Sequence, residues 1–294
     1  MMRDFRDRIL NGILFIPATF SGMLLIVMVL TLVQKSGQIL SSQPLVDLLF
    51  SSSWQPVAGN FGFFPFIMGT IWVTALAMMA AIPVSILCAI YLSEYAHVRV
   101  REIIQPVIDL LAGIPSVVYG LFGILLIVPL IKNSVAPLFG VTSSGYCVLA
   151  GGIVLAIMVF PILISISYEV FRTVPLEMRE ASLGLGATRW ETVKHVVLRR
   201  AFPGVIAAII LGFSRAFGET MAVLMVVGNA ARVPTSVFDP AYPIPALIAN
   251  NYGEMMSIPL YDSALMFAAL LLLVVVVIFN ITAKYVLLKI RVVN

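Results

Sequence analysis

The chain has 294 residues, of which 61% are hydrophobic and only 11% are charged, and its net charge is +4. A soluble domain carries about 25% charged residues, so this composition cannot cover a water-facing surface and predicts a membrane protein. The basic excess then indicates orientation in the membrane and not nucleic-acid binding. The two cysteines, Cys88 and Cys147, fall in or beside apolar segments without the spacing of a metal site or a disulfide framework.

In chain order, a short basic head (1–12) is followed by apolar runs that are each long enough to cross a bilayer as a helix. The first run is too long for the apolar region of a signal peptide, and no small-residue cleavage site closes it. An external loop (34–65) with a short helix around Leu45–Phe50 follows, and a tail (284–294) ends the chain. The sequence therefore predicts an all-α membrane protein with six transmembrane helices. The six runs are 13–33, 66–92, 106–131, 146–167, 203–227 and 264–283.

Lysine and arginine predict the orientation of these helices. If the N-terminus lies inside, fourteen of the 18 basic residues fall in inner segments, whereas Lys35, Lys132 and Arg232 fall in outer loops. Cytoplasmic loops carry such an excess of positive charge. We therefore expect a multi-pass protein of the cytoplasmic membrane, with both termini and segment 168–202 in the cytoplasm.

The cytoplasmic segment 168–202 shows helical signals. Residues 176–183 favour a helix, Gly184 and Gly186 interrupt it, and a second helix is predicted over 188–200. Thr188 with Glu191 three residues later is the pattern of a capping box. Two short helices joined by a glycine turn are too small to fold alone, so the sequence predicts a projection that packs on a partner.

The fifth run (203–227) contains two charges, Arg215 and Glu219. A charge at the centre of a bilayer costs about 2.5–3.5 kcal/mol on insertion scales. The i, i+4 spacing predicts that both lie on one face of a helix. In one interpretation, the two charges neutralise each other and hold the bundle. In the other, they line a translocation path, where the planar guanidinium fork of the arginine suits an oxyanion and the glutamate restrains the arginine.

Glycines recur within the runs, and small residues let membrane helices approach closely, although they can also mark hinges. Asp109, near the start of the third run, is expected at a helix end within reach of water. His97 and His195 are expected on the surface, and no catalytic or metal-binding constellation is present. The glycines concerned are Gly113, Gly120, Gly123, Gly151, Gly152, Gly204, Gly212 and Gly218.

Glu180-Ala181-Ser182, then Gly186 and later Val196 and Leu198, resemble the glutamate-alanine-alanine ("EAA") loop of ABC-importer permeases. The family pattern has alanine, isoleucine and proline where this chain has Ser182, Val196 and Arg199, and the missing proline leaves the end of the second short helix open. The resemblance implies the type I ABC-importer permease (MetI-like) fold and a loop that docks on a cytoplasmic ATPase. The residues expected to couple to that ATPase are Glu180, Ala181, Gly186, Ala187, Thr188 and Trp190.

Three longer stretches, Gly69 to Ala96, Leu110 to Gly123 and Arg215 to Asn229, are similar to phosphate-importer permeases of the PstC type. The resemblance implies a translocation path with Arg215, Glu219 and Thr220, and alternating access driven by ATP. It also implies a cytoplasmic ATPase dimer, a second permease of the PstA type and an extracytoplasmic phosphate-binding protein as partners. The sequence contains no P-loop, so ATP and Mg²⁺ would bind to the separate ATPase and no cofactor is expected on this chain.

Other functions remain open at this point. A permease for sulfate or molybdate would share Arg215 but not the whole run from Gly218 to Asn229. An ion-coupled carrier acting alone would show internal repeats with discontinuous helices, and no convincing repeat is visible. A structural membrane scaffold would leave the charged fifth run unexplained. The sequence therefore favours a non-enzymatic subunit that translocates phosphate across the cytoplasmic membrane.

Overall fold

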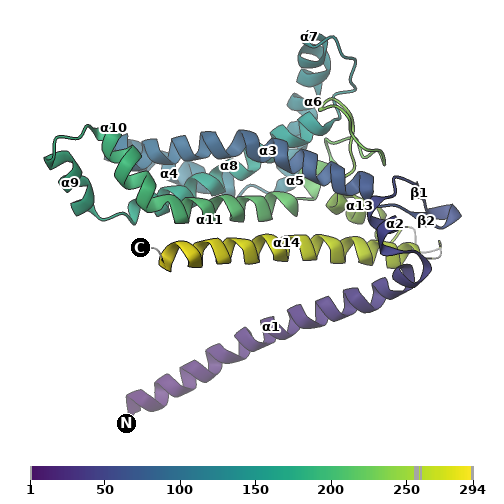
Figure 1. Ribbon diagram of the computed structural model, residues 1–294, viewed down its shortest axis with the longest axis horizontal. Coiled ribbons are helices and arrows are strands. Elements are labelled where there is room, and N and C mark those ends of the chain that lie inside the picture. Colours follow the sequence, from purple (N-terminus) through teal and green to yellow (C-terminus); the bar gives the residue numbers. More distant parts are fainter. Residues whose placement is uncertain (1, 255–257, 259, 293–294) are drawn as a thin grey trace.

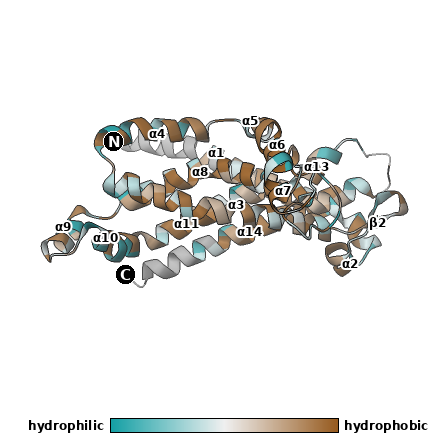
Figure 2. Ribbon diagram, turned by 90° about the horizontal axis from the view of Figure 1, so that it is seen from above, coloured by the Kyte–Doolittle hydropathy of each residue, from teal (hydrophilic) through white to brown (hydrophobic). Residues whose placement is uncertain are grey.

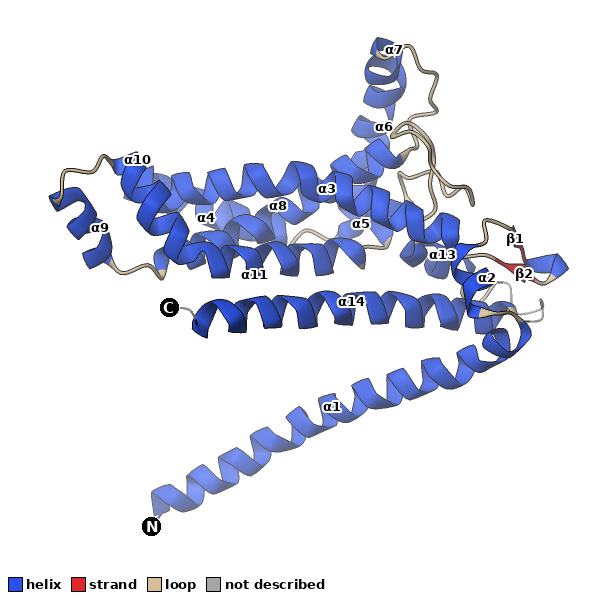
Figure 3. Ribbon diagram, in the orientation of Figure 1, coloured by secondary structure: helices blue, strands red, loops and turns tan. Residues whose placement is uncertain are grey.

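The computed structural model describes residues 2–254, 258 and 260–292, and Figure 1 shows an elongated bundle of roughly parallel helices. Nearly all of the regular structure is helical, with one small β-hairpin (Figure 3). Several helices continue into π-helical turns, and one 3₁₀ turn connects the two β-strands; both kinds are labelled η here. The helices are α1 (Met2–Ser42), α2 (Leu45–Phe50), α3 (Phe64–Ile90), α4 (Val98–Ala112), α5 (Ser116–Phe122), α6 (Val128–Leu130), α7 (Ala136–Leu138), α8 (Val148–Arg172), α9 (Leu176–Gly184), α10 (Arg189–Thr192), α11 (Leu198–Phe217), α12 (Met221–Leu224), α13 (Ile244–Asn251) and α14 (Tyr261–Val292).

Within the described residues, six helical segments are long and apolar enough to cross a membrane, as the sequence predicts. Figure 2 shows apolar residues along the middle of the bundle, with hydrophilic residues concentrated toward its two ends. The polar end that carries α9 and α10 lies opposite the end that carries α2 and the hairpin. The six segments are 15–42, 64–95, 116–138, 148–172, 189–217 and 261–282.

The first and third spans differ clearly from the predicted runs. The first helix extends from Met2 to Ser42, beyond the run 13–33, so the predicted external loop begins as helix. The third run (106–131) is not one helix, because α4 ends at Ala112 and the chain restarts as α5 at Ser116. The helix then continues through π-helical turns (η3, Gly123–Ile127; η4, Ile131–Val135) to Leu138, where a loop was expected at Lys132.

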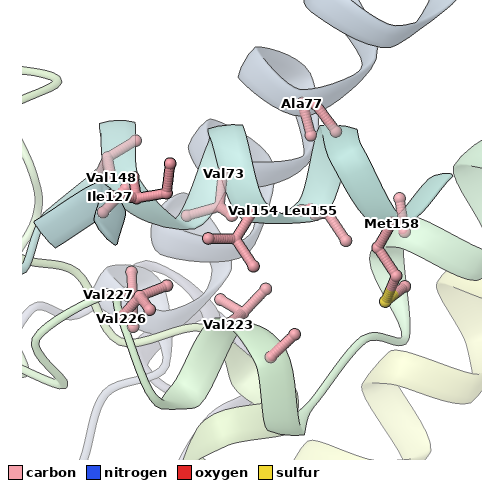
Figure 4. Close-up of a cluster of buried hydrophobic side chains, with 14 of the residues drawn as sticks. Val73, Ala77, Ile127, Val148, Val154, Leu155, Met158, Val223, Val226 and Val227 are labelled. Atoms are coloured by element: carbon pink, nitrogen blue, oxygen red, sulfur yellow. The ribbon is translucent and has the colours of Figure 1, made fainter. Parts of the chain in front are cut away.

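The largest core lies where α3, α8 and the segment around α12 meet (Figure 4). Valine and alanine dominate it, and such small or β-branched side chains allow closely spaced helices to interdigitate without voids. Fully or nearly fully buried members from these three elements include Val73, Leu155 and Val226. This core supports the backbone on which the charged residues of the fifth span are mounted.

Most of the glycines in the spans serve this close packing. At Gly120, Gly123, Gly152, Gly204 and Gly212, an added Cβ would lie 2.5–2.7 Å from a side chain of another helix. A Cβ at the neighbouring Gly151 would lie 3.3 Å from Val73 Cγ1. Gly113 and Gly218 differ, since a Cβ there would meet only backbone oxygens of the preceding turn.

These two remaining glycines mark the two helix breaks. Gly113 follows α4 as its C-cap, and Gly218 follows α11 as its C-cap. Close packing therefore accounts for six of the eight glycines, while Gly113 and Gly218 lie at helix ends, and the prediction of hinges stays a prediction.

The end of the bundle opposite α9 is closed by an aromatic cluster. The hairpin of β1 (Trp54–Gln55) and β2 (Asn60–Phe61) places Trp54 within 4.7–5.9 Å, between ring centroids, of four aromatic rings. α1 joins the bundle at the same end, where Ile39 N donates to Ser263 Oγ (3.0 Å) and Ser263 Oγ donates to the Lys35 carbonyl (2.7 Å). The short helix predicted at Leu45–Phe50 is confirmed as α2.

The loop that follows α12 caps the start of α8. The backbone N–H groups of Val148 and Leu149 donate to the carbonyls of Asp239 (2.9 Å) and Val237 (2.8 Å). Helix N-termini leave such donors without partners inside the helix. Asp239 holds this loop in turn, because one carboxylate oxygen accepts from Thr235 N, Thr235 Oγ1 and Ser236 N at 2.8–3.0 Å. The hydrogen bonds from Thr235 lower the pKa of Asp239 below its ordinary value.

Candidate functional site

The fifth span is broken between its two charges. α11 ends at Phe217, Gly218 to Thr220 leave the helix, and α12 resumes for four residues. The prediction that Arg215 and Glu219 lie on one face of a continuous helix over 203–227 is therefore wrong. Hydropathy favours helix across the whole run, but the chain turns at Gly218, where no side chain crowds the backbone.

Arg215 lies in the last turn of α11. Gly212, three residues earlier on α11, faces Leu163 of α8 and Met78 of α3, which lie near the middle of those two helices. The next residue, Ala216, is buried in the main core with Leu155, whereas Arg215 itself is exposed. No carboxylate oxygen of a described residue lies within 4.0 Å of its guanidinium, so the two charges do not form the internal ion pair that was one reading of the sequence.

Glu219 has a structural role at the break. Its Oε1 accepts from the backbone N–H of Ala222 (3.2 Å), which caps the first turn of α12. The half-buried Glu219 also lines a narrow pocket with Thr70 and Thr74 of α3, whose volume of about 10 Å³ is close to that needed by one water. Thr220 donates from Oγ1 to the Gly218 carbonyl (3.3 Å), so its hydroxyl is directed back into the break.

α5 approaches the break from the other side. A Cβ on Gly120 would lie 2.5 Å from Met225 Sδ and 3.3 Å from Ala222 Cα, so α5 and the segment around α12 pack with their backbones close together. Tyr119 donates its hydroxyl to the carbonyl of Leu111 (2.7 Å), at the C-terminal end of α4. The broken third span and the broken fifth span therefore meet beside Arg215. Sequence reasoning missed Tyr119, because a tyrosine in an apolar run is usually a core residue.

Asp109 lies on α4, before the third membrane segment (116–138), as an exposed side chain 3.5 Å from the Ser165 hydroxyl on α8. It is near the C-terminal end of α4 and not near its start, because α4 begins eight residues before the predicted run. Among the described residues, no group of three His, Cys, Asp or Glu side chains is arranged to hold a metal ion.

The projection at the polar end matches the sequence prediction in most details. α9 covers residues 176–184, and Gly186 adopts a left-handed φ of 89° that turns the chain. Thr188 caps α10: its Oγ1 accepts from Glu191 N (3.3 Å), and Glu191 Oε2 accepts from Thr188 N (2.7 Å). One detail differs, since the second short helix does not end near residue 200. It continues through a π-helical turn (η5, Val193–Val197) and Pro203 into α11.

The residues predicted to couple to an ATPase lie together on this projection. Glu180, Ala181, Gly186, Thr188 and Trp190 are exposed, and Ala187 is half-buried in the turn between α9 and α10. Large apolar side chains on the same segment are also exposed: Leu185 by 89%, Leu176 by 64% and Trp190 by 52%. α9 contributes no buried residue, so this surface is available for another protein.

Sequence reasoning also missed an ion pair beneath this surface. Arg179 of α9 pairs with Glu94 in the π-helical turn that ends the second span (η2, Tyr91–Tyr95), with Nη2 to Oε1 at 2.9 Å. The two residues are 85 positions apart in polar segments, and nothing in a single sequence indicates that they meet.

The arrangement of the six membrane helices is similar to that of solved ABC transporter chains. A chain of the MetNI methionine ABC transporter, in an inward-facing conformation, overlays with a TM-score of 0.58 and 17% sequence identity, covering 77% of this chain and 93% of that one. This likeness confirms the predicted MetI-like fold.

The family model described as binding-protein-dependent transport system inner membrane component matches residues 81–292, and the chain belongs to this family. The probable ABC transporter permease protein YqgH of Bacillus subtilis (strain 168) is 39% identical over 242 residues, which are 82% of this chain and 77% of that protein. The phosphate transport system permease protein PstC of Mesorhizobium japonicum is 37% identical over 258 residues, 83% of this chain and 79% of that protein. The chain is thus a multi-pass membrane transport subunit, as its sequence predicts.

Proposed function

We propose that this chain is the membrane-spanning permease subunit of an ATP-driven importer of inorganic phosphate. The family supports a binding-protein-dependent transporter, and relatives named as phosphate permeases support the substrate. The chain itself performs no covalent chemistry on its substrate. It provides half of a path through the membrane. It also provides the surface on which an ATPase acts to open and close that path.

The single observation that carries the proposal is the exposure of Arg215 beside the middle of the bundle. A charge that faced lipid at this depth would cost about 2.5–3.5 kcal/mol, and charged residues in membrane spans instead face protein or a water-filled path. Because no described carboxylate pairs with Arg215, its charge is available to a passing anion. A guanidinium presents paired N–H donors that match an oxyanion such as phosphate.

Glu219 and Thr220 complete this part of the path. Glu219 holds the break in shape through its bond to α12, and its negative charge opposes long residence of a dianion near Arg215. The Thr220 hydroxyl adds a polar group at the same break. A site of this kind binds weakly, as a path must, and leaves tight selection to the binding protein.

A second permease subunit of the PstA type covers the exposed face of Arg215, so that the path runs between the two chains. The extracytoplasmic phosphate-binding protein docks at the end of the bundle that carries α2, α13 and the β-hairpin. A cytoplasmic ATPase dimer, which binds ATP and Mg²⁺, docks on the exposed surface of α9 and α10. Both termini lie in the cytoplasm in this orientation, and the chain requires no cofactor of its own.

The test is uptake of labelled phosphate by the complete complex in proteoliposomes, with the ATPase supplied with ATP and the binding protein on the opposite side. Arg215→Gln removes the charged donor. A hydrogen bond to a charged group contributes about 1.5–3 kcal/mol, so uptake should fall by roughly 10- to 150-fold. Arg215→Lys keeps the charge but not the paired donors and should retain intermediate activity.

Arg172→Gln is the matched control, because Arg172 is an exposed arginine at the end of α8 that pairs with Glu169 only at 3.9 Å. This variant should transport normally. Normal uptake by assembled Arg215→Gln complex would contradict the proposed path. The unmodified complex is also assayed with each anion and the binding protein for that anion. Uptake of sulfate in place of phosphate would contradict the proposed substrate.

A further inference from the structure

A buried ion pair ties the coupling projection to the second membrane span. Arg179 on α9 meets Glu94 with both arms of its guanidinium group: Nη2 lies 2.9 Å from Oε1, and Nε lies 3.2 Å from Oε2. The side chains are only 16% and 10% exposed, respectively. Two parallel charge-assisted hydrogen bonds fix orientation as well as distance, so α9 cannot rotate or slide on this span without breaking them.

The same guanidinium also holds the end of a third element. Arg179 Nη2 donates to the Phe171 carbonyl (2.9 Å), and Nη1 donates to the Val174 carbonyl. Phe171 lies in the last turn of α8, whose final carbonyls have no partners within the helix. One side chain therefore connects α9 with the end of α3 through η2 and with the end of α8.

Few other contacts hold α9 in place. It contributes no buried residue, and its neighbouring apolar side chains point to solvent. The Ser182 hydroxyl lies 2.9 Å from the Thr192 hydroxyl, which joins α9 to α10 but not to the second span. α10 reaches the same π-helical turn separately, where the Arg189 guanidinium lies 5.4 Å from the centroid of the Tyr95 ring.

We propose that Arg179 and Glu94 are positioning residues that transmit the displacement of α9 by the ATPase to the second and fourth spans. The inference rests on the proposed function, since it assigns a route to the motion that an importer requires. The π-helical turn that carries Glu94 suits this role, because π-helical turns are frequent at functional sites. α3 and α8 form the closely packed core that supports the break beside Arg215, so a movement of their ends reaches the path.

The loss of an ion pair affects stability differently from the loss of apolar packing. Removing one partner leaves a buried charge without compensation and destabilises the region, whereas neutralising both partners restores much of the stability. Neutralising both does not restore the directional bonds. A structural role and a transmitting role therefore predict different behaviour for the doubly neutral variant.

The experiment measures phosphate taken up per ATP hydrolysed by the reconstituted complex. Glu94→Gln, Arg179→Lys and the double variant Glu94→Gln/Arg179→Gln are compared with the unmodified chain. We expect the double variant to assemble and to hydrolyse ATP, while uptake per ATP falls by at least about fivefold, the lower end of typical coupling between sites. Arg179→Lys, which keeps the charge and loses the fork, should fall less.

Glu169→Gln is the control, because it removes an exposed pair on the last turns of α8 and should leave the ratio unchanged. The inference would be overturned if uptake and ATP hydrolysis fell together in the Glu94 and Arg179 variants, so that their ratio stayed at that of the control. It would also be overturned if the double variant recovered full coupling along with assembly. Failure of the proposed function is distinguishable, since the unmodified complex would then take up no phosphate at all.

Discussion

Two adjacent glycines in α8 allow the packing of the bundle to be tested quantitatively. Gly152 faces Leu76 of α3: a Cβ placed there would lie 2.6 Å from Leu76 Cδ2, 3.0 Å from Cγ and 3.1 Å from Cβ. Rotation of the leucine side chain moves Cδ2 and Cγ but leaves Cβ in place, so it cannot relieve the whole overlap. A Cβ on Gly151 would lie 3.3 Å from Val73 Cγ1, which requires a shift of only a few tenths of an ångström.

The two substitutions by alanine differ in this overlap and in little else. Both gain about 0.8–1.0 kcal/mol from the higher helix propensity of alanine. Overpacking at Gly152 costs about 1–3 kcal/mol because α3 and α8 must separate. Gly152→Ala should therefore be less stable than Gly151→Ala by about 1–3 kcal/mol, whereas Gly151→Ala should equal or exceed the unmodified chain.

The measurement is the free energy of unfolding of the detergent-solubilised chain in a denaturant titration. A double variant, Gly152→Ala with Leu76→Ala, identifies the cause. The space vacated by the leucine receives the new methyl group, so the two changes should compensate by about 0.5–3 kcal/mol relative to their sum. Equal stability of the two glycine variants, or simple additivity in the double variant, would refute the reasoning.

Three further predictions concern single hydrogen-bonded sites. Glu219→Gln keeps an acceptor for the N–H at the start of α12, so it should preserve stability while prolonging the occupancy of the path by phosphate. Glu219→Ala should also lose about 1 kcal/mol of capping. Measurements of unfolding and of uptake on both variants separate the two effects. Thr188→Ala should remove the capping box with Glu191 at a cost of about 0.5–2 kcal/mol, seen as faster amide hydrogen exchange in the first turn of α10. Asp239 contributes stability that is complete above the ordinary aspartate pKa of about 4 and is lost as the pH falls through its lowered folded-state value. Thr235→Val should therefore move the acid midpoint of loop opening to higher pH, and an unmoved midpoint would contradict this assignment.

The sequence predicts features that depend on local chemistry. The capping box at Thr188 and the glycine turn at Gly186 need only a few neighbouring residues, and both are found where they were expected. The apolar runs predict the number of spans because burial in lipid requires about 20 apolar residues whatever the tertiary structure.

The helix breaks could not be located in the same way. Hydropathy across residues 203–227 is high on both sides of Gly218, and the bonds that stabilise the break come from tertiary contacts or from a side chain folding back. The same holds for the third span, where Tyr119 satisfies a carbonyl at the end of α4. Consequently the sequence predicted Arg215 as a site residue but not its exposed setting, in which no carboxylate of the described part of the chain pairs with it.

The attachment of α1 has a consequence for the way this protein responds to its membrane. A helix of 41 residues is roughly 60 Å long at 1.5 Å per residue, well beyond the ~30 Å hydrocarbon core of a bilayer. Among the residues whose side chains are described, hydrogen bonds join it to α14 at Lys35 and Ile39, and Figure 1 shows it diverging from the bundle toward its N-terminus. Where α1 has left the bundle, we expect its inclination to respond to the hydrophobic thickness of the bilayer. The spans that pack on one another should keep their mutual angles when the lipid composition changes.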